Sequence, residues 1–123
     1  VAPNVKPVYE ALLHKAGGKL VYNPIHGGHL TLSVLFRQLA EGSLGQVIQS
    51  VLVEAGPGLS TALIQQDLVD RLSLFIAPKL VGGGVPSFRG IGIPSMDQAI
   101  DFVEYIWEQV GSDLLFTGWR RTV

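Results

Sequence analysis

The sequence predicts an α/β fold, in which helices flank a mixed sheet and a C-terminal antiparallel hairpin completes it. Three observations lead to this prediction. Segments with the apolar spacing of helices alternate with short apolar runs that are typical of strands. One such run, residues 50–54, is apolar on both faces and leads through a Gly-Pro-Gly turn into a helix, as buried parallel strands do. Near the C-terminus, Gly111-Ser112-Asp113 separates two loosely alternating segments, a pattern that predicts a hairpin.

The first half of the chain contains two predicted helices and one predicted strand. Residues 6–16 place Val8, Leu12 and Leu13 at helical spacing, and two glycines follow the last turn. Residues 19–23 have the composition of a short strand that Pro24 ends. Residues 31–40 carry a leucine-rich apolar stripe, which predicts a second helix.

The second half repeats the alternation. The run at residues 50–54 predicts a strand buried on both faces, and residues 59–66 predict a helix. Residues 72–77 predict another strand, which Pro78 closes. Five glycines and one proline mark residues 81–92 as a loop. Residues 100–109 and 114–119 are the strands of the predicted hairpin.

Composition limits the classes of protein to which the chain can belong. Its 123 residues allow one domain, 1–123. Nine basic and ten acidic residues exclude a strongly basic nucleic-acid binder. A hydrophobic content of 47% against 15% charged residues excludes a disordered chain, and indicates that a partner, a ligand or further chain covers some apolar surface. Because there is no cysteine, disulfide scaffolds and Cys-ligated metals are excluded. No segment has the length and apolarity of a membrane span.

The turn after residues 50–54 is the best candidate for a binding site. In open α/β sheets, ligands bind beyond the carboxyl ends of strands, and the free N–H groups of a helix N-terminus suit a phosphate. Small residues at 55, 56, 58 and 60 allow a ligand to approach the backbone, and Glu54 stands at the strand end. The alternative interpretation is an ordinary strand–turn–helix corner with a surface glutamate, since such glycine turns are common.

Three linked stretches carry a family resemblance. They are Ser50-Val-Leu-Val-Glu-Ala-Gly-Pro, then Leu68-Val-Asp-Arg-Leu, then Ile76-Ala-Pro-Lys-Leu-Val-Gly-Gly-Gly84. In this order and at these separations they strongly resemble the reductase domain of bacterial riboflavin-biosynthesis proteins. The resemblance covers most of residues 6–84 and, more loosely, the final hairpin. It implies a dihydrofolate-reductase-like fold and, in the full protein, fusion to a deaminase domain.

The resemblance also implies a reaction. The family uses NADPH to reduce the ribosyl group of 5-amino-6-(5-phosphoribosylamino)uracil to ribityl, because a ribosylamine can open to an imine that accepts hydride at C1′. It implies that Glu54 is the catalytic and substrate-binding carboxylate. The residues it implies for cofactor binding are Gly56, Pro57, Gly58, Leu59, Ser60, Thr61 and Ala62. Ala55 departs from the glycine that many members have there.

Length is a larger departure from the family. Its reductase domain carries a preceding half with the first strands and further substrate and cofactor contacts, and nothing in residues 1–123 resembles that half. We therefore expect either the C-terminal portion of a reductase domain or a shortened relative. Two other functions stay open. One is a dihydrofolate-reductase-like enzyme with another pteridine or pyrimidine substrate, and the other is a non-catalytic oligomerisation module.

Two further expectations concern metals and partners. His26 and His29 flank two glycines, but no cysteine and no nearby carboxylate completes a ligand set, so we expect a solvated polar loop and no metal. The chain is apolar and weakly charged, and its hairpin carries Phe102, Tyr105, Ile106 and Trp107. This predicts a homodimer or larger assembly that buries part of the hairpin. The resemblance implies a cytoplasmic enzyme with neither nucleic-acid nor membrane partners.

Overall fold

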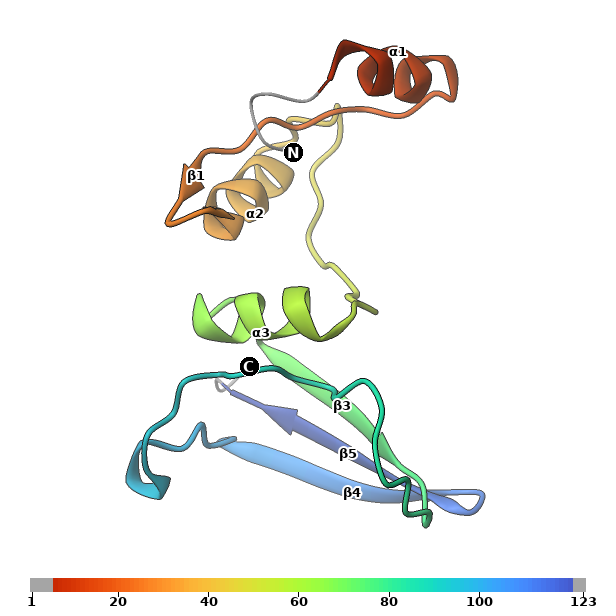
Figure 1. Cartoon of the computed structure of the whole chain (residues 1–123), viewed down its shortest axis with the longest axis vertical. Helices are drawn as coiled ribbons and strands as arrows, with labels where there is room; N and C mark the ends of the chain where they lie inside the picture. The colour runs from red at the N-terminus through yellow and green to blue at the C-terminus, as the bar shows by residue number, and fades with distance from the viewer. Residues whose placement is uncertain (1–5, 121–123) are drawn as a thin grey trace. The chain divides into compact units, whose positions relative to one another are not determined.

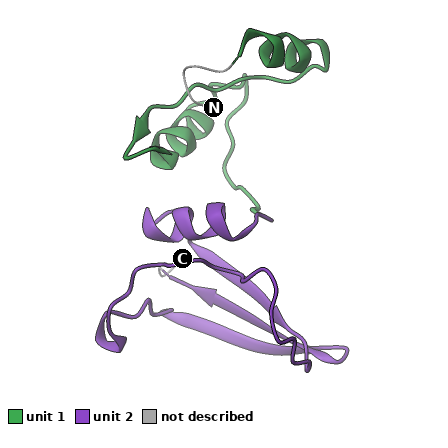
Figure 2. Ribbon diagram, in the orientation of Figure 1, with its two compact units in different colours: residues 1–53 green, residues 54–123 purple. Residues whose placement is uncertain are grey.

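The computed structural model describes residues 6–120, which form two compact units (Figure 2). Of the described residues, 6–53 belong to unit 1 and 54–120 to unit 2. Unit 1 carries two helices and a two-stranded ribbon, and unit 2 carries one helix, a three-stranded sheet and a short 3₁₀ helix (Figure 1). The α/β class with flanking helices is confirmed, and the organisation as one domain stays a prediction. Among residues 6–120, no helix is long and apolar enough to cross a bilayer.

The helices of unit 1 form where the sequence predicts them. Helix α1 (Pro7–Lys15) begins with proline at its first turn, where the missing N–H costs nothing, and Gly17 follows it with φ of 76°. Helix α2 (Leu32–Ala40) buries Leu32, and Gly42 follows it with φ of 79°. The start of α1 and the ends of both helices depend on residues next to each other in the chain. The sequence alone was therefore sufficient to predict these two helices.

The predicted strand at residues 19–23 is wrong. The segment runs without regular secondary structure, because no strand within residues 6–120 forms a hydrogen-bonding ladder with it. Side chains anchor it instead. The Tyr22 hydroxyl donates to Glu10 Oε1 at 2.8 Å, Gln38 Nε2 donates to the Tyr22 carbonyl at 3.5 Å, and Lys19 Nζ donates to the Leu44 carbonyl.

A two-stranded ribbon follows where a loop was expected. Strands β1 (Ile25–His26) and β2 (His29–Leu30) pair antiparallel, with His26 opposite His29. Gly27 and Gly28 have φ of 58° and 82°, and two consecutive positive φ angles are what a tight two-residue hairpin turn requires. The two consecutive glycines are the sequence feature from which this hairpin could have been predicted.

Unit 2 is built on a three-stranded antiparallel sheet with the order β3-β5-β4. Strand β3 (Arg71–Ile76) and strand β4 (Glu104–Val110) both pair with the central strand β5 (Asp113–Trp119). Gly111, with φ of 63°, turns β4 into β5, so the predicted hairpin is confirmed. Its first strand begins at Glu104, later than residue 100. The loop at residues 81–92 is also confirmed, and the 3₁₀ helix η1 (Met96–Gln98) lies after it.

One face of this sheet carries an aromatic cluster. The register places Leu74 and Trp107 on either side of Phe116, and Leu72 and Tyr105 on either side of Gly118. The Phe116 ring lies 5.2 Å from that of Phe102 and 4.8 Å from that of Trp107, measured between centroids. Position 118 must be glycine, because a Cβ there would lie 2.7 Å from both phenylalanine rings.

Helix α3 (Pro57–Gln65) is the helix of unit 2, and its Leu63 is 4% exposed. It begins two residues before the predicted start. The predicted strand that precedes it, residues 50–54, is wrong: the segment pairs with nothing among residues 6–120, and its three apolar side chains are exposed. All strand pairs in residues 6–120 are antiparallel, so a parallel neighbour for this segment is not among them.

Candidate functional site

Glu54 lies where the sequence places it, directly before the turn that leads into α3. It is the first residue of unit 2 and its side chain is exposed. No residue between Glu54 and Pro57 has a bulky side chain. The carboxylate is therefore exposed directly before α3, although it does not end a strand, and its role in a site stays a prediction.

The start of α3 leaves backbone donors free. Gly56 is the N-cap residue, with φ of −70° and ψ of 171°, and no side chain caps the helix. The Ser60 N–H donates to the Gly56 carbonyl at 3.2 Å, and Pro57 has no N–H. Within residues 6–120, the N–H groups of Gly58 and Leu59 have no partner, as is usual for the first turn of a helix.

The same turn is open to an approaching molecule. A Cβ built on Gly56 or on Gly58 would meet no atom within 4 Å. Ser60 is half-buried, and its hydroxyl donates to the Ala55 carbonyl at 3.3 Å, which fixes the turn from its inner side. Two free N–H groups, the positive end of the helix dipole and open space suit a phosphate group. The residues present therefore fit the pyrophosphate of a dinucleotide.

Thr61 belongs to the other side of the helix. It is 6% exposed, and its Oγ1 accepts a hydrogen bond of 2.8 Å from the Arg89 N–H. One helical turn later, Gln65 Nε2 donates to the carbonyls of Gly90 and Ile91, each at 3.2 Å. The Thr61 and Gln65 side chains thus bind the glycine-rich loop to α3. Ala62 is half-buried beside Thr61, whereas Leu59 is exposed.

Sequence reasoning missed Arg89. The Thr61 hydrogen bond brings its backbone to the first turns of α3, and its side chain is exposed. The contact fixes the backbone of the loop against α3 at Thr61. The two residues are 28 positions apart, and nothing in the pattern links them except the presence of a basic residue in a glycine-rich loop.

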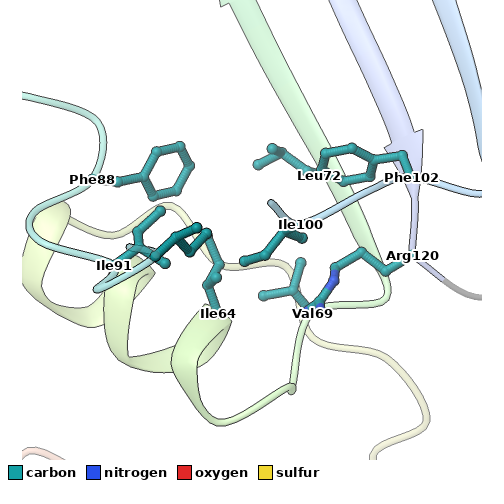
Figure 3. Close-up of a pocket in the computed structure, with 9 residues that line it drawn as sticks. Ile64, Val69, Leu72, Phe88, Ile91, Ile100, Phe102 and Arg120 are labelled. Atoms are coloured by element: carbon teal, nitrogen blue, oxygen red, sulfur yellow. The ribbon is translucent and has the colours of Figure 1, made fainter. Parts of the chain in front are cut away.

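A separate apolar cavity of about 240 Å³ lies between α3, the sheet and the loop (Figure 3). Ile64 lies on one side of it and Leu72 on the other, with Phe88 and Ile91 from the loop. Arg120 is its one charged lining residue, and Arg120 Nη1 forms an ion pair of 2.9 Å with Asp67 Oδ1. None of Glu54 and residues 56–62 lines it. The cavity is therefore lined mainly by apolar side chains, and the candidate site lies outside it.

The structure holds no cluster of three or more metal-ligating side chains within residues 6–120. His26 and His29 face each other across the β1–β2 ribbon and are both exposed. Among residues 6–120, no carboxylate or third imidazole completes a set of three ligands with them. The chemistry available at the candidate site is thus that of one carboxylate and a row of backbone donors.

Comparisons with known proteins identify the family of the chain. Residues 6–116 match the family described as the RibD C-terminal domain. The riboflavin biosynthesis protein RibD of Escherichia coli K12 is 41% identical over 88 residues, which are 71% of this chain and 22% of that protein. The chloroplastic riboflavin biosynthesis protein PYRR of Arabidopsis thaliana is 34% identical over 76 residues, covering 60% of this chain and 13% of that protein.

A solved structure has the same fold. The RibD protein of Acinetobacter baumannii, in form 1, superposes with a TM-score of 0.68 at 24% identity, covering 89% of this chain and 28% of that one. At this identity the likeness concerns the fold. The chain spans about a fifth of the length of the E. coli relative, so most of each relative lies outside the matched segment.

Proposed function

This chain belongs to the family of the RibD C-terminal domain, and from that premise we propose that it serves an NADPH-dependent reductase of riboflavin biosynthesis. The proposed reaction reduces the ribosyl group of 5-amino-6-(5-phosphoribosylamino)uracil to ribityl. The observation that supports it most directly is the exposed Glu54 carboxylate immediately before the open, uncapped start of α3. The carboxylate suits a substrate hydroxyl, and the backbone N–H groups at the start of α3 suit a cofactor phosphate. These two kinds of partner lie within five residues of each other in the chain.

The proposed role of the turn is to hold NADPH by its pyrophosphate. The backbone N–H groups of Gly58 and Leu59 donate to phosphate oxygens, and the glycines at 56 and 58 permit the close approach. Ser60, Thr61 and Ala62 maintain the helix start that presents those donors. When bound, NADPH supplies the hydride. Since the turn is a small part of the surface that a dinucleotide contacts, we expect weak or absent NADPH binding to the chain alone, measurable by calorimetry.

The proposed role of Glu54 is to bind and polarise the substrate. Its carboxylate accepts hydrogen bonds from ribose hydroxyls, and such charge-assisted bonds are stronger than neutral ones. An imine that is protonated before reduction carries positive charge, which the carboxylate stabilises more in the transition state than in the ground state. That difference lowers the barrier instead of only tightening binding.

The test is Glu54→Gln in an intact reductase that carries this segment, such as the E. coli relative with its matched residues replaced by those of this chain. The substitution keeps the shape and removes the charge. We expect kcat/KM to fall by about tenfold to a thousandfold, with NADPH affinity nearly unchanged. Gln49→Glu, which adds a carboxylate five residues earlier, is the matched control and should have little effect. Full activity of Glu54→Gln would remove Glu54 from the site, and loss through unfolding would assign it a structural role.

The proposed function also concerns the location, fusion partner and oligomeric state of the enzyme. We propose a cytoplasmic protein that works beside, or is fused to, a deaminase domain, and that forms a homodimer or larger assembly. Every residue of β4 is exposed, and Tyr105 and Trp107 present their rings on one face of it. Burial of such aromatic side chains is a strong source of association energy. Sedimentation should show a dimer or larger species, and a clean monomer at high micromolar concentration would contradict this part.

A further inference from the structure

The apolar cavity between α3, the sheet and the loop has no part in the function proposed above. Its volume is about 240 Å³. Apolar cavities of about 150 Å³ bind benzene, so this one has room for a single aromatic ring with a short substituent. All of its lining residues lie between positions 64 and 120, in unit 2, and none belongs to the candidate site at Glu54 and residues 56–62. The cavity is therefore a separate space within unit 2.

Hydrogen bonds hold one wall of the cavity in place. Phe88 and Ile91 line the cavity from the glycine-rich loop (Figure 3). Gln65 Nε2 donates to the carbonyls of Gly90 and Ile91, each at 3.2 Å. The Thr61 hydroxyl accepts a further bond of 2.8 Å from the backbone of the residue after Phe88. Because three consecutive loop residues are bonded to α3, the loop resists collapse into the space beneath it.

The polar end of the cavity is the Arg120 guanidinium, which lies among the apolar lining side chains (Figure 3). Its Nη1 forms an ion pair of 2.9 Å with Asp67 Oδ1. Neither Nη1 nor Nε has a hydrogen-bond partner of suitable geometry among residues 6–120, and both atoms are covered from water. A covered donor without an acceptor costs stability, so a ligand oxygen at this end of the cavity would be bound favourably.

The ion pair limits the charge that a ligand can carry. Because Asp67 balances the positive charge of Arg120, an anionic ligand would bring an unbalanced charge into an apolar space. A cationic ligand would be repelled by the guanidinium as well. We propose that the cavity binds a small neutral molecule, whose apolar body is about the size of one aromatic ring and whose single acceptor oxygen lies against the Arg120 guanidinium.

NMR titration of the full chain tests this binding. The probes are acetophenone, which carries the oxygen, and ethylbenzene, which has nearly the same shape without it. We expect saturable shifts of the methyl signals of Ile64, Leu72 and Ile100, which line the cavity. Dissociation constants on the order of 0.1–1 mM are expected for molecules of this size. Leu80, a fully exposed leucine outside the cavity, should show no saturable shift.

Substitution of Arg120 tests the polar end of the cavity. Arg120→Met keeps an apolar stem and removes the donors, while Asp67 stays hydrated because its side chain is 60% exposed. We expect the affinity for acetophenone to fall at least about tenfold, the scale of one bond to a charged group, and that for ethylbenzene to change less than about twofold. Each probe is compared with itself, so differences in hydration between the probes cancel.

Two further variants serve as controls. Arg89→Met removes an exposed guanidinium that does not line the cavity, and neither affinity should change. Arg120→Lys keeps a charge beside Asp67 and lacks the Nε–H group, and it replaces Arg120→Met if that variant does not fold. We expect it to lower the affinity for acetophenone several-fold and to leave that for ethylbenzene unchanged.

Any of three results would reject the proposal. In the first, neither probe gives a saturable shift at the cavity residues. In the second, the shifts are largest at exposed residues such as Leu80 and rise linearly with concentration, as for adsorption to the apolar surface. In the third, substitution of Arg120 weakens both probes equally, or Arg89→Met weakens acetophenone as much as Arg120→Met does. Binding of the probes does not depend on the proposed reduction, because the cavity contains no residue of the candidate site.

Discussion

Residues 50–54 and strand β3 are short apolar segments on the two sides of α3 in the sequence, and their sequences are similar. Each is rich in valine, leucine or isoleucine, and each is free of glycine and proline. Strand β3 pairs along its whole length with β5, from Arg71 opposite Trp119 to Ile76 opposite Leu114. Residues 50–54 pair with nothing in residues 6–120.

The difference shows that a strand belongs to a pair of segments and not to one. Strand propensity measures how well side chains fit a pleated, half-covered surface, so it has no effect until a neighbour supplies that surface. For β3 the neighbour is β5, and Phe116 and Gly118 of β5 complete the face on which Leu72 and Leu74 lie. Substitutions that disrupt the packing of that face should therefore weaken the pairing of β3, so that it becomes an uncovered segment like residues 50–54.

The largest effect is expected for Phe116→Ala. The Phe116 ring contacts those of Phe102, Tyr105 and Trp107, and joins β5 to β4 and to the segment before it. We expect the free energy of unfolding to fall by about 2–3 kcal/mol, below the range for a fully buried phenylalanine because this one is half-buried. Urea unfolding followed by tryptophan fluorescence measures it. Phe75→Ala, on the exposed face of β3, is the control, and an equal loss there would contradict the role of the cluster.

Gly118→Ala should have the next largest effect, by overfilling the same face. The added methyl would lie 2.7 Å from ring atoms of Phe102 and Phe116, so both rings must shift. We expect a loss of about 1–3 kcal/mol, the usual cost of overpacking. Gly83→Ala, where a Cβ meets nothing within 4 Å, should leave the melting temperature almost unchanged. If the two variants melt alike, β5 is not packed as described.

A paired leucine truncation compares the two segments directly. Leu74 is half-buried on β3, and its replacement by alanine should reduce the stability of the isolated chain by about 1–2 kcal/mol. Leu52→Ala should change it by less than about 0.5 kcal/mol, as for exposed positions. Equal losses in urea unfolding would mean that residues 50–54 are already covered in the isolated chain, which would remove the contrast.

The smallest effect concerns residues 19–23, the other segment that was wrongly predicted as a strand, which Tyr22 ties to α1. The hydrogen bond from Tyr22 to Glu10 raises the pKa of the tyrosine above its ordinary value of 10. A raised folded-state pKa means that the bond contributes stability below pH 10 and loses it as the pH rises through the folded pKa. Tyr22→Phe should therefore be slightly less stable than the natural chain at neutral pH, and the two should converge in strong alkali. Thermal melts across this pH range measure the difference, and a constant difference would contradict the bond.

Local chemistry made much of the fold predictable. Apolar spacing and the glycines after α1 and α2 predicted both helices of unit 1. Alternation around Gly111 predicted the β4–β5 hairpin. The position of Glu54 directly before a glycine turn and a helix start was also predictable, because these features are adjacent in the chain, whereas the role of Glu54 in a site stays a prediction. Helix capping, turn geometry and periodicity all act over a few residues, so a single sequence is enough to determine them.

Long-range partners decided the rest. The sequence does not show that Thr61 binds the backbone of Arg89, that Gly118 must accommodate two phenylalanine rings, or that Asp67 pairs with Arg120. Each joins positions far apart in the chain, and each depends on the packing of α3, the loop and the sheet. The same reason explains why β3 became a strand and residues 19–23 and 50–54 did not. A ladder needs backbone groups from a second segment, and only the tertiary structure decides where such a segment lies.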